Sequence, residues 1–168
     1  MIIMVFGLPG SGKSYFASRV AEMIHGDYLN SDKLRKQMFG IRTYSIKEKL
    51  SVYNEMLAQM QKAIKQNKNV VLDATFYTND IRKKFIDEVK NKDLVFIEVT
   101  AEEPLIRERL KRPRGDSEAD FEVYKKINQE WEPLHENHLI LTSTDDNIKD
   151  MLEKTADYLH LGDDKGTN

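Results

Sequence analysis

Residues 7–14 read GLPGSGKS, and their types and spacing suit a loop that holds phosphate. They fit the pattern G-x-x-x-x-G-K-[ST], in which glycines let successive backbone N–H groups turn inward around phosphate oxygens. Lys13 can place its charge on the β- and γ-phosphates, and the Ser14 hydroxyl can ligate Mg²⁺. The alternative is a glycine-rich turn between a strand and a helix. The pattern predicts a nucleoside triphosphate site made of Gly7, Pro9, Gly10, Ser11, Gly12, Lys13, Ser14 and Tyr15.

Asp32 and Arg35 follow the second strand candidate, at the sheet edge where ligands of parallel sheets bind. A carboxylate there can accept the proton of an attacking hydroxyl. Arg35, three residues later on the same helical face, can hold an anionic part of the acceptor. The alternative for Asp32 is a helix cap, because Ser31 or Asp32 before an amphipathic segment is a common helix start. The residues alone leave both interpretations open.

Asp73 ends the apolar run at 70–72 and is expected at the same edge of the sheet. It can lie behind the ligands of a magnesium ion, or it can anchor Arg35. An ordinary polar strand end is the alternative.

Residues 107–114 carry five basic side chains in eight positions. A mobile arginine segment that closes over a triphosphate neutralises charge in the transition state of phosphoryl transfer. Pro113 and Gly115 mark a break in the chain, which is consistent with a hinged lid. The alternative is a basic helix end exposed to solvent.

These residues require a scaffold, and the chain alternates short apolar runs with amphipathic stretches. Apolar strands buried on both faces and alternating with helices predict a three-layer α/β domain. The loop at 7–14 makes it one of the P-loop NTPase type. We expect a mostly parallel five-stranded sheet with helices on both faces and an arginine-bearing lid. The P-loop domain is predicted over residues 1–160, with a flexible tail at 161–168. The expected strands lie at 2–6, 28–29, 70–72, 94–97 and 139–141, and the expected helices include 13–25, 45–67, 107–111, 121–131 and 147–159.

The composition limits the classes of function. The 168 residues include 26 basic and 28 acidic side chains, so the near-neutral charge argues against a general nucleic-acid coat. Cysteine is absent, which excludes disulfides and thiolate chemistry and suits the cytoplasm. No apolar run approaches the roughly 20 residues that span a bilayer. Residues 33–49 nevertheless hold six basic side chains against one acidic, and residues 105–114 hold five against one, which predicts a basic mouth on an acidic body.

Nucleotide binding leaves the class of enzyme open. A GTPase needs a guanine-reading N-K-x-D segment, and the NKD at 91–93 lacks that spacing. An AAA-type motor needs a longer chain. A nucleoside monophosphate kinase usually shows D-G-[FY]-P-R where this chain has DATF at 73–76.

Four segments together resemble, in order and spacing, the P-loop kinase family that includes polynucleotide 5′-hydroxyl kinases and zeta-toxin-like kinases. They are the loop at 7–14, SDKLR at 31–35, VLDAT at 71–75 with Arg82, and residues 109–112 with SEAD at 117–120. The loop is specific only for nucleotide, whereas D-x-x-R after the second strand and the arginine lid are more specific to these kinases. The resemblance implies that Lys13 and Ser14 serve ATP and Mg²⁺.

The resemblance also implies roles at the acceptor. Asp32 would be the general base on the acceptor hydroxyl, Arg35 would bind an acceptor phosphate, and Asp73 would support that arrangement. Arg109 and Arg112 would be lid arginines on the donor phosphates. They lie three positions apart, where polynucleotide kinases can show four, so which of them contacts the γ-phosphate stays open.

The sequence therefore predicts an ATP-dependent phosphotransferase that moves the γ-phosphate to an acceptor hydroxyl. The favoured acceptor is the 5′-hydroxyl of a polynucleotide, so a nucleic-acid end is an expected partner beside the nucleoside triphosphate. A small-molecule or nucleotide-sugar kinase is one alternative. A non-catalytic ATP-binding regulatory module is another. The oligomeric state stays open, and no membrane partner is expected.

Overall fold

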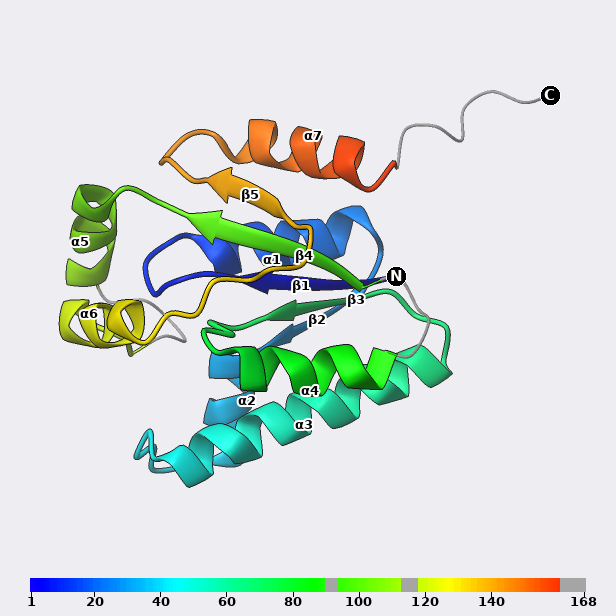
Figure 1. Cartoon of the computed structure of the whole chain (residues 1–168), viewed down its shortest axis with the longest axis horizontal. Helices are drawn as coiled ribbons and strands as arrows, with labels where there is room; N and C mark the ends of the chain where they lie inside the picture. The colour runs from blue at the N-terminus through cyan, green and yellow to red at the C-terminus, as the bar shows by residue number, and fades with distance from the viewer. Residues whose placement is uncertain (90–93, 113–117, 161–168) are drawn as a thin grey trace.

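The computed structural model describes residues 1–89, 94–112 and 118–160, and within them it forms five strands and seven helices (Figure 1). The strands are β1 (Ile2–Phe6), β2 (Asp27–Asn30), β3 (Val70–Asp73), β4 (Leu94–Thr100) and β5 (Leu139–Thr142). The helices are α1 (Lys13–Met23), α2 (Ser31–Met38), α3 (Ile46–Lys65), α4 (Asn79–Val89), α5 (Glu103–Lys111), α6 (Phe121–Gln129) and α7 (Ile148–Tyr158).

The five strands form one sheet in the order β2-β3-β1-β4-β5, and all four pairings are parallel. The chain leaves β1 for β2 on one side and later crosses β1 to reach β4 on the other. The strand order therefore reverses around β1, which places a ligand crevice beyond its carboxyl end. The predicted α/β fold of the P-loop NTPase type, with its five-stranded sheet, is confirmed.

Helices cover both faces of the sheet, as Figure 1 shows, because the strands are apolar on both sides. One core cluster joins alternate residues of the sheet to α2, α3 and α4, and it includes Met56 and Met60, both fully buried. The second cluster joins the other face to α1 and α7. The ends of the strands point toward α5 and α6, which pack against each other through a small cluster of their own.

Arg82 is the largest fully buried side chain of the described residues. Its guanidinium lies 5.3 Å from the ring of Phe6 and 5.4 Å from that of Trp131, and its Nε donates to the carbonyl of Phe76 at 2.6 Å. Trp131 in turn stacks on Phe6 with ring centroids 6.1 Å apart. The arginine therefore fastens the segment after β3 and the segment before β5 to the central strand.

The predicted tail at 161–168 lies outside the described residues, and so do Pro113 and Gly115 of the predicted hinge. The division into a domain and a tail therefore stays a prediction. Within the described ranges, no helix is long and apolar enough to cross a membrane.

A buried methionine tests the packing of α3 in the core. We expect Met56→Ala to lower the free energy of unfolding by about 2–5 kcal/mol, since it leaves a cavity at a fully buried position. Met38→Ala, at a position 39% exposed, should change it little. Urea unfolding followed by circular dichroism measures both; equal midpoints for the two variants would contradict the packing.

Candidate active site

The loop at residues 7–14 leaves β1 and delivers its backbone to the start of α1. Gly7 lies so close to β4 that a Cβ there would sit 2.2 Å from the Val99 carbonyl oxygen. Gly12 has φ +89°, a left-handed conformation, and it precedes α1 without any side-chain cap. The first N–H groups of α1 are thus left for an anion, which the helix dipole also favours.

A cavity of about 470 Å³ opens beside this loop. Among the predicted nucleotide-binding residues, those that line it are Gly10, Gly12, Lys13, Ser14 and Tyr15. Gly7, Pro9 and Ser11 are buried and shape the turn behind it. The opposite wall consists of the loop between β5 and α7 and of Arg109 and Arg112 from the end of α5. The cavity therefore joins the phosphate loop to both predicted lid arginines.

Arg109 is fixed between two loops. It donates to the Gly10 carbonyl at 3.3 Å, to Ser143 Oγ at 2.8 Å and to the Thr144 carbonyl at 3.0 Å. Ser143 Oγ in turn donates to the Ser11 carbonyl at 2.5 Å. Arg109 thus holds the phosphate loop against the loop after β5. Arg112, three residues later, also lines the cavity.

Asp73 is fully buried at the end of β3, where the sheet register places it beside Val5 of β1 and Asn30 of β2. Its Oδ2 accepts a hydrogen bond from the Asn30 amide at 2.5 Å and from the Tyr28 hydroxyl at 2.6 Å. The Asn30 amide also lies 3.4 Å from Ser14 Oγ. Burial and the charge of Asp73 raise the pKa of Tyr28, which therefore stays a donor.

The site fits a magnesium ion by the chemistry of its donors. Asp73 Oδ1 is buried and has no hydrogen-bond partner among the described residues. The Asn30 amide contacts both Asp73 Oδ2 and the Ser14 hydroxyl, so one amide links these two oxygens. Within the same residues, no group of three or more His, Cys, Asp or Glu side chains could hold a metal alone. Mg²⁺ usually binds through one or two carboxylates together with substrate phosphates, so this donor set suits it.

The start of α2 bears on one of the two interpretations of Asp32, the helix cap. The cap is Asn30, whose Oδ1 accepts from the Lys33 amide at 2.9 Å. Ser31 and Asp32 are the first two residues of the helix, so the sequence-based assignment of the cap to either of them is wrong. Asp32 lies half-buried in the first turn, where the helix dipole favours a carboxylate.

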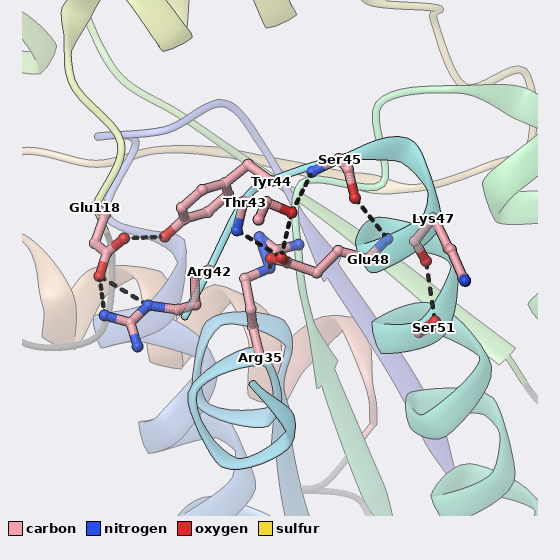
Figure 2. Close-up of polar contacts among 9 residues, drawn as sticks. All are labelled: Arg35, Arg42, Thr43, Tyr44, Ser45, Lys47, Glu48, Ser51 and Glu118. Carbon is pink, nitrogen blue, oxygen red and sulfur yellow. Dashed lines mark hydrogen bonds and ion pairs between the residues drawn. The ribbon is translucent and has the colours of Figure 1, made fainter. Parts of the chain in front are cut away.

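Arg35 lies one turn further along α2 and pairs with Glu48 of α3 (Figure 2). Glu48 is buried and Arg35 is partly buried, and Arg35 Nε lies 3.2 Å from Glu48 Oε1. Glu48 Oε2 also accepts from the Thr43 backbone and hydroxyl at 2.7 and 2.9 Å. Asp73 instead binds Tyr28 and Asn30, so the expectation that Asp73 anchors Arg35 is wrong.

Glu48 favours its ionised form although its side chain is buried. Burial disfavours the ionised carboxyl, but hydrogen bonds from Thr43 and the charge of Arg35 more than offset this, and the pKa of Glu48 is lowered. The guanidinium of Arg35 also lies 4.7 Å from the ring of Tyr44. The predicted acceptor arginine is thus held in place by Glu48 and Tyr44.

Several site residues escape the sequence analysis. Tyr28 begins the predicted strand at 28–29 and Asn30 follows it, and a polar residue before a helix signals the cap at Asn30. Ser143 follows an apolar strand, which is the position that made Asp73 a candidate. Glu48 is one acid in a basic stretch, and no local pattern indicates that it is buried.

The family of the chain follows from residues 2–134, which match the family model described as the AAA domain. The match covers most of the chain, so the chain belongs to this family. The match concerns the domain family alone, and the exclusion of an AAA-type motor on chain length stays a prediction. The coarser part of the resemblance, a P-loop kinase domain, is confirmed.

One protein is similar to this chain in sequence, and two solved structures are similar to it in fold. A shikimate kinase from Corynebacterium glutamicum is 26% identical over 140 residues, which cover 80% of this chain and 81% of that protein. A sugar kinase from Janibacter sp. HTCC2649 superposes with a TM-score of 0.72 at 13% identity and covers 99% of this chain and 98% of its own. An APS kinase from Mycobacterium tuberculosis, solved with AMPPNP and APS, has a TM-score of 0.70 at 17% identity and covers 95% and 96%.

The Arg35–Glu48 pair makes a prediction about pH. A lowered folded-state pKa means that the Glu48 carboxylate stabilises the fold above the ordinary glutamate pKa, and that this stabilisation is lost as pH falls through the lowered value. We expect Glu48→Gln to be less stable than the parent chain at neutral pH, with the difference shrinking in acid. Denaturant unfolding across pH measures it.

The control for that comparison is Glu108→Gln, which removes an exposed carboxylate paired with Lys111. Its effect on stability should be small, since exposed ion pairs contribute little. A Glu48→Gln chain as stable as the parent at neutral pH, or a difference that grows in acid, would contradict the account of Glu48.

Proposed function

We propose that the protein is an ATP-dependent kinase that transfers the γ-phosphoryl group to a hydroxyl of a small molecule. One observation carries the proposal: the hydrogen bonds of Asn30 join the phosphate loop and Asp73 to the helix that bears Asp32. The Asn30 amide reaches Asp73 and Ser14 on the phosphate side, and its carbonyl oxygen caps the helix that bears Asp32. A switch without transfer has no need of a carboxylate beside an acceptor site.

The phosphate loop supplies most of the donor chemistry. Backbone N–H groups at the start of α1 and the Lys13 ammonium bind the β- and γ-phosphates, and the loop orients them toward the carboxyl edge of the sheet. Ser14 and Asp73 are the residues that would hold Mg²⁺. The ion, when bound, neutralises charge that develops on the phosphates.

Asp32 provides the acceptor chemistry. Its carboxylate accepts the proton of the acceptor hydroxyl while the new bond forms between that oxygen and the γ-phosphorus. The bond from the γ-phosphorus to the β-bridging oxygen breaks, and ADP leaves with its electron pair. Arg112, which lines the nucleotide cavity, would neutralise the transferring group. Arg109 would keep the phosphate loop in register with the loop after β5.

Two observations favour a small acceptor over the polynucleotide end that the sequence favours. The similar proteins are kinases of small molecules by their names. Five of the eleven basic side chains expected to form a polyanion mouth also pair with a carboxylate: Arg35, Arg42, Arg107, Arg109 and Lys111. The local charge available to a nucleic-acid backbone is therefore smaller than the sequence count indicates.

The proposal is tested by phosphoryl transfer from labelled ATP to a panel of hydroxyl compounds. The panel contains sugars, hydroxy acids, a nucleotide sugar and a 5′-hydroxyl oligonucleotide. Lys13→Ala should abolish ATP turnover. Asp32→Asn should lower transfer by about 10²- to 10⁴-fold, the usual contribution of a general base, and spare the affinity for an ATP analogue.

The matched control is Asp80→Asn, since Asp80 lies in the first turn of α4 as Asp32 does in α2. It should retain full activity. Full transfer by the Asp32→Asn chain would contradict the assignment of the base. Transfer to the oligonucleotide alone would restore the polynucleotide interpretation, and ATP binding without any product would favour a regulatory module.

A further inference from the structure

One carboxylate joins two segments far apart in the sequence, beside Arg35 and Glu48 (Figure 2). Glu118 precedes α6, and its Oε1 accepts from Arg42 Nε at 2.9 Å and from Arg42 Nη2 at 2.5 Å. Its Oε2 accepts from the Tyr44 hydroxyl at 2.5 Å. Arg42 and Tyr44 belong to the loop between α2 and α3, so three donors from that loop satisfy both oxygens of one carboxylate.

Hydrogen bonds hold the loop that carries Arg42 and Tyr44 in place. Thr43, between them, is tied to the buried Glu48 by its backbone N–H and its hydroxyl. Ser45 Oγ caps α3 by accepting from the Glu48 amide at 3.2 Å. Tyr44 itself has φ +54°, a left-handed conformation that costs energy for a residue with a side chain and persists only where neighbours enforce it. The loop is thus built to present Arg42 and Tyr44 in one arrangement.

This arrangement adjoins the proposed base. The Tyr44 ring packs on the Arg35 guanidinium, and burial, Glu118 and the nearby charge of Asp32 raise the pKa of Tyr44 to about 12. Tyr44 therefore keeps its proton and remains a donor at neutral pH. Hydrogen bonds from Arg42 and Tyr44 lower the pKa of Glu118, so the group they hold is an anion.

The contact is also accessible. The side chains of Arg42 and Glu118 are 27% and 42% exposed, and Tyr44 is 45% exposed. A structural ion pair so exposed adds little to stability, because solvent screens it. A guanidinium that donates twice to one carboxylate oxygen, with a hydroxyl that donates to the other, is by contrast a set of donors suited to a carboxylate on a ligand.

We propose that Arg42 and Tyr44 form a carboxylate subsite for the acceptor, which the chain's own Glu118 fills until an acidic acceptor replaces it. The inference rests on the proposed kinase function and narrows its substrate to a hydroxy acid. Glu118 is a tethered competitor, so it weakens acceptor binding and favours ligands that offer a carboxylate together with a hydroxyl near Asp32. Arg35, which Glu48 already pairs, serves as a positioning residue for Tyr44.

The test compares hydroxy acids, shikimate and gluconate among them, each with its neutral amide. We expect the parent chain to prefer the acids, and Arg42→Gln to lower kcat/KM for the preferred acid by about 10- to 100-fold, as for loss of a charged hydrogen bond. Transfer to the amide should be unchanged. Glu118→Gln should lower KM for the acid and leave kcat nearly constant, because it removes the competitor.

Two variants control for charge alone: Lys83→Gln and Asp87→Asn disrupt an exposed ion pair on α4 and should match the parent chain. The subsite is overturned if acid and amide react equally, if Arg42→Gln slows both alike, or if Glu118→Gln raises KM for the acid.

Equilibrium binding separates this inference from the kinase proposal. With ADP present, calorimetric titration of the Glu118→Gln chain with the same acids should show binding that the Glu118→Gln, Arg42→Gln chain loses. That result would support the subsite even if no compound is phosphorylated, which would refute the kinase proposal alone. Failure of every acid to bind the Glu118→Gln chain would overturn the subsite, even if a neutral compound is phosphorylated.

Discussion

The site depends on one buried carboxylate. Asp73 ends the strand beside β1 and is fully buried, so its charge must be met by hydrogen bonds from within the protein. Tyr28 and Asn30, from the neighbouring strand, supply them at 2.6 and 2.5 Å. Because the strands are held in parallel register, the end of β2 can take few other positions. The hydrogen bond to Asp73 thus holds Asn30 at the end of β2, and α2 begins at the next residue.

Asn30 contacts the donor side of the site with its amide and the acceptor side with its carbonyl oxygen. Its amide lies near Ser14, at the start of the helix that receives phosphate, and its oxygen caps the helix that carries Asp32 and Arg35. Arg35 then pairs with Glu48, which in turn holds the loop that bears Arg42 and Tyr44. Donor site, base and acceptor loop are therefore joined through Asn30, Arg35 and Glu48.

The sequence predicts the scaffold well because apolar strands and amphipathic helices are local patterns. The strand predicted at 2–6 has those bounds, and the other predicted elements differ at their ends by a few residues. The phosphate loop is a local pattern too. Partners distant along the chain carry no such signal: Glu48 meets Arg35, Arg109 meets Ser143, and Glu118 meets Arg42 across 76 positions. These contacts depend on strand order, which sequence periodicity leaves open.

The most direct test of this network is the split between catalysis and nucleotide binding in Asn30→Ser. Serine still caps a helix but lacks the amide that reaches Asp73. We expect kcat for phosphoryl transfer to fall by about tenfold or more, as for loss of a supporting hydrogen bond, with the Kd of an ATP analogue nearly unchanged. An unchanged kcat, or a loss of nucleotide affinity by the same factor, would contradict the claim that Asn30 couples the two halves of the site.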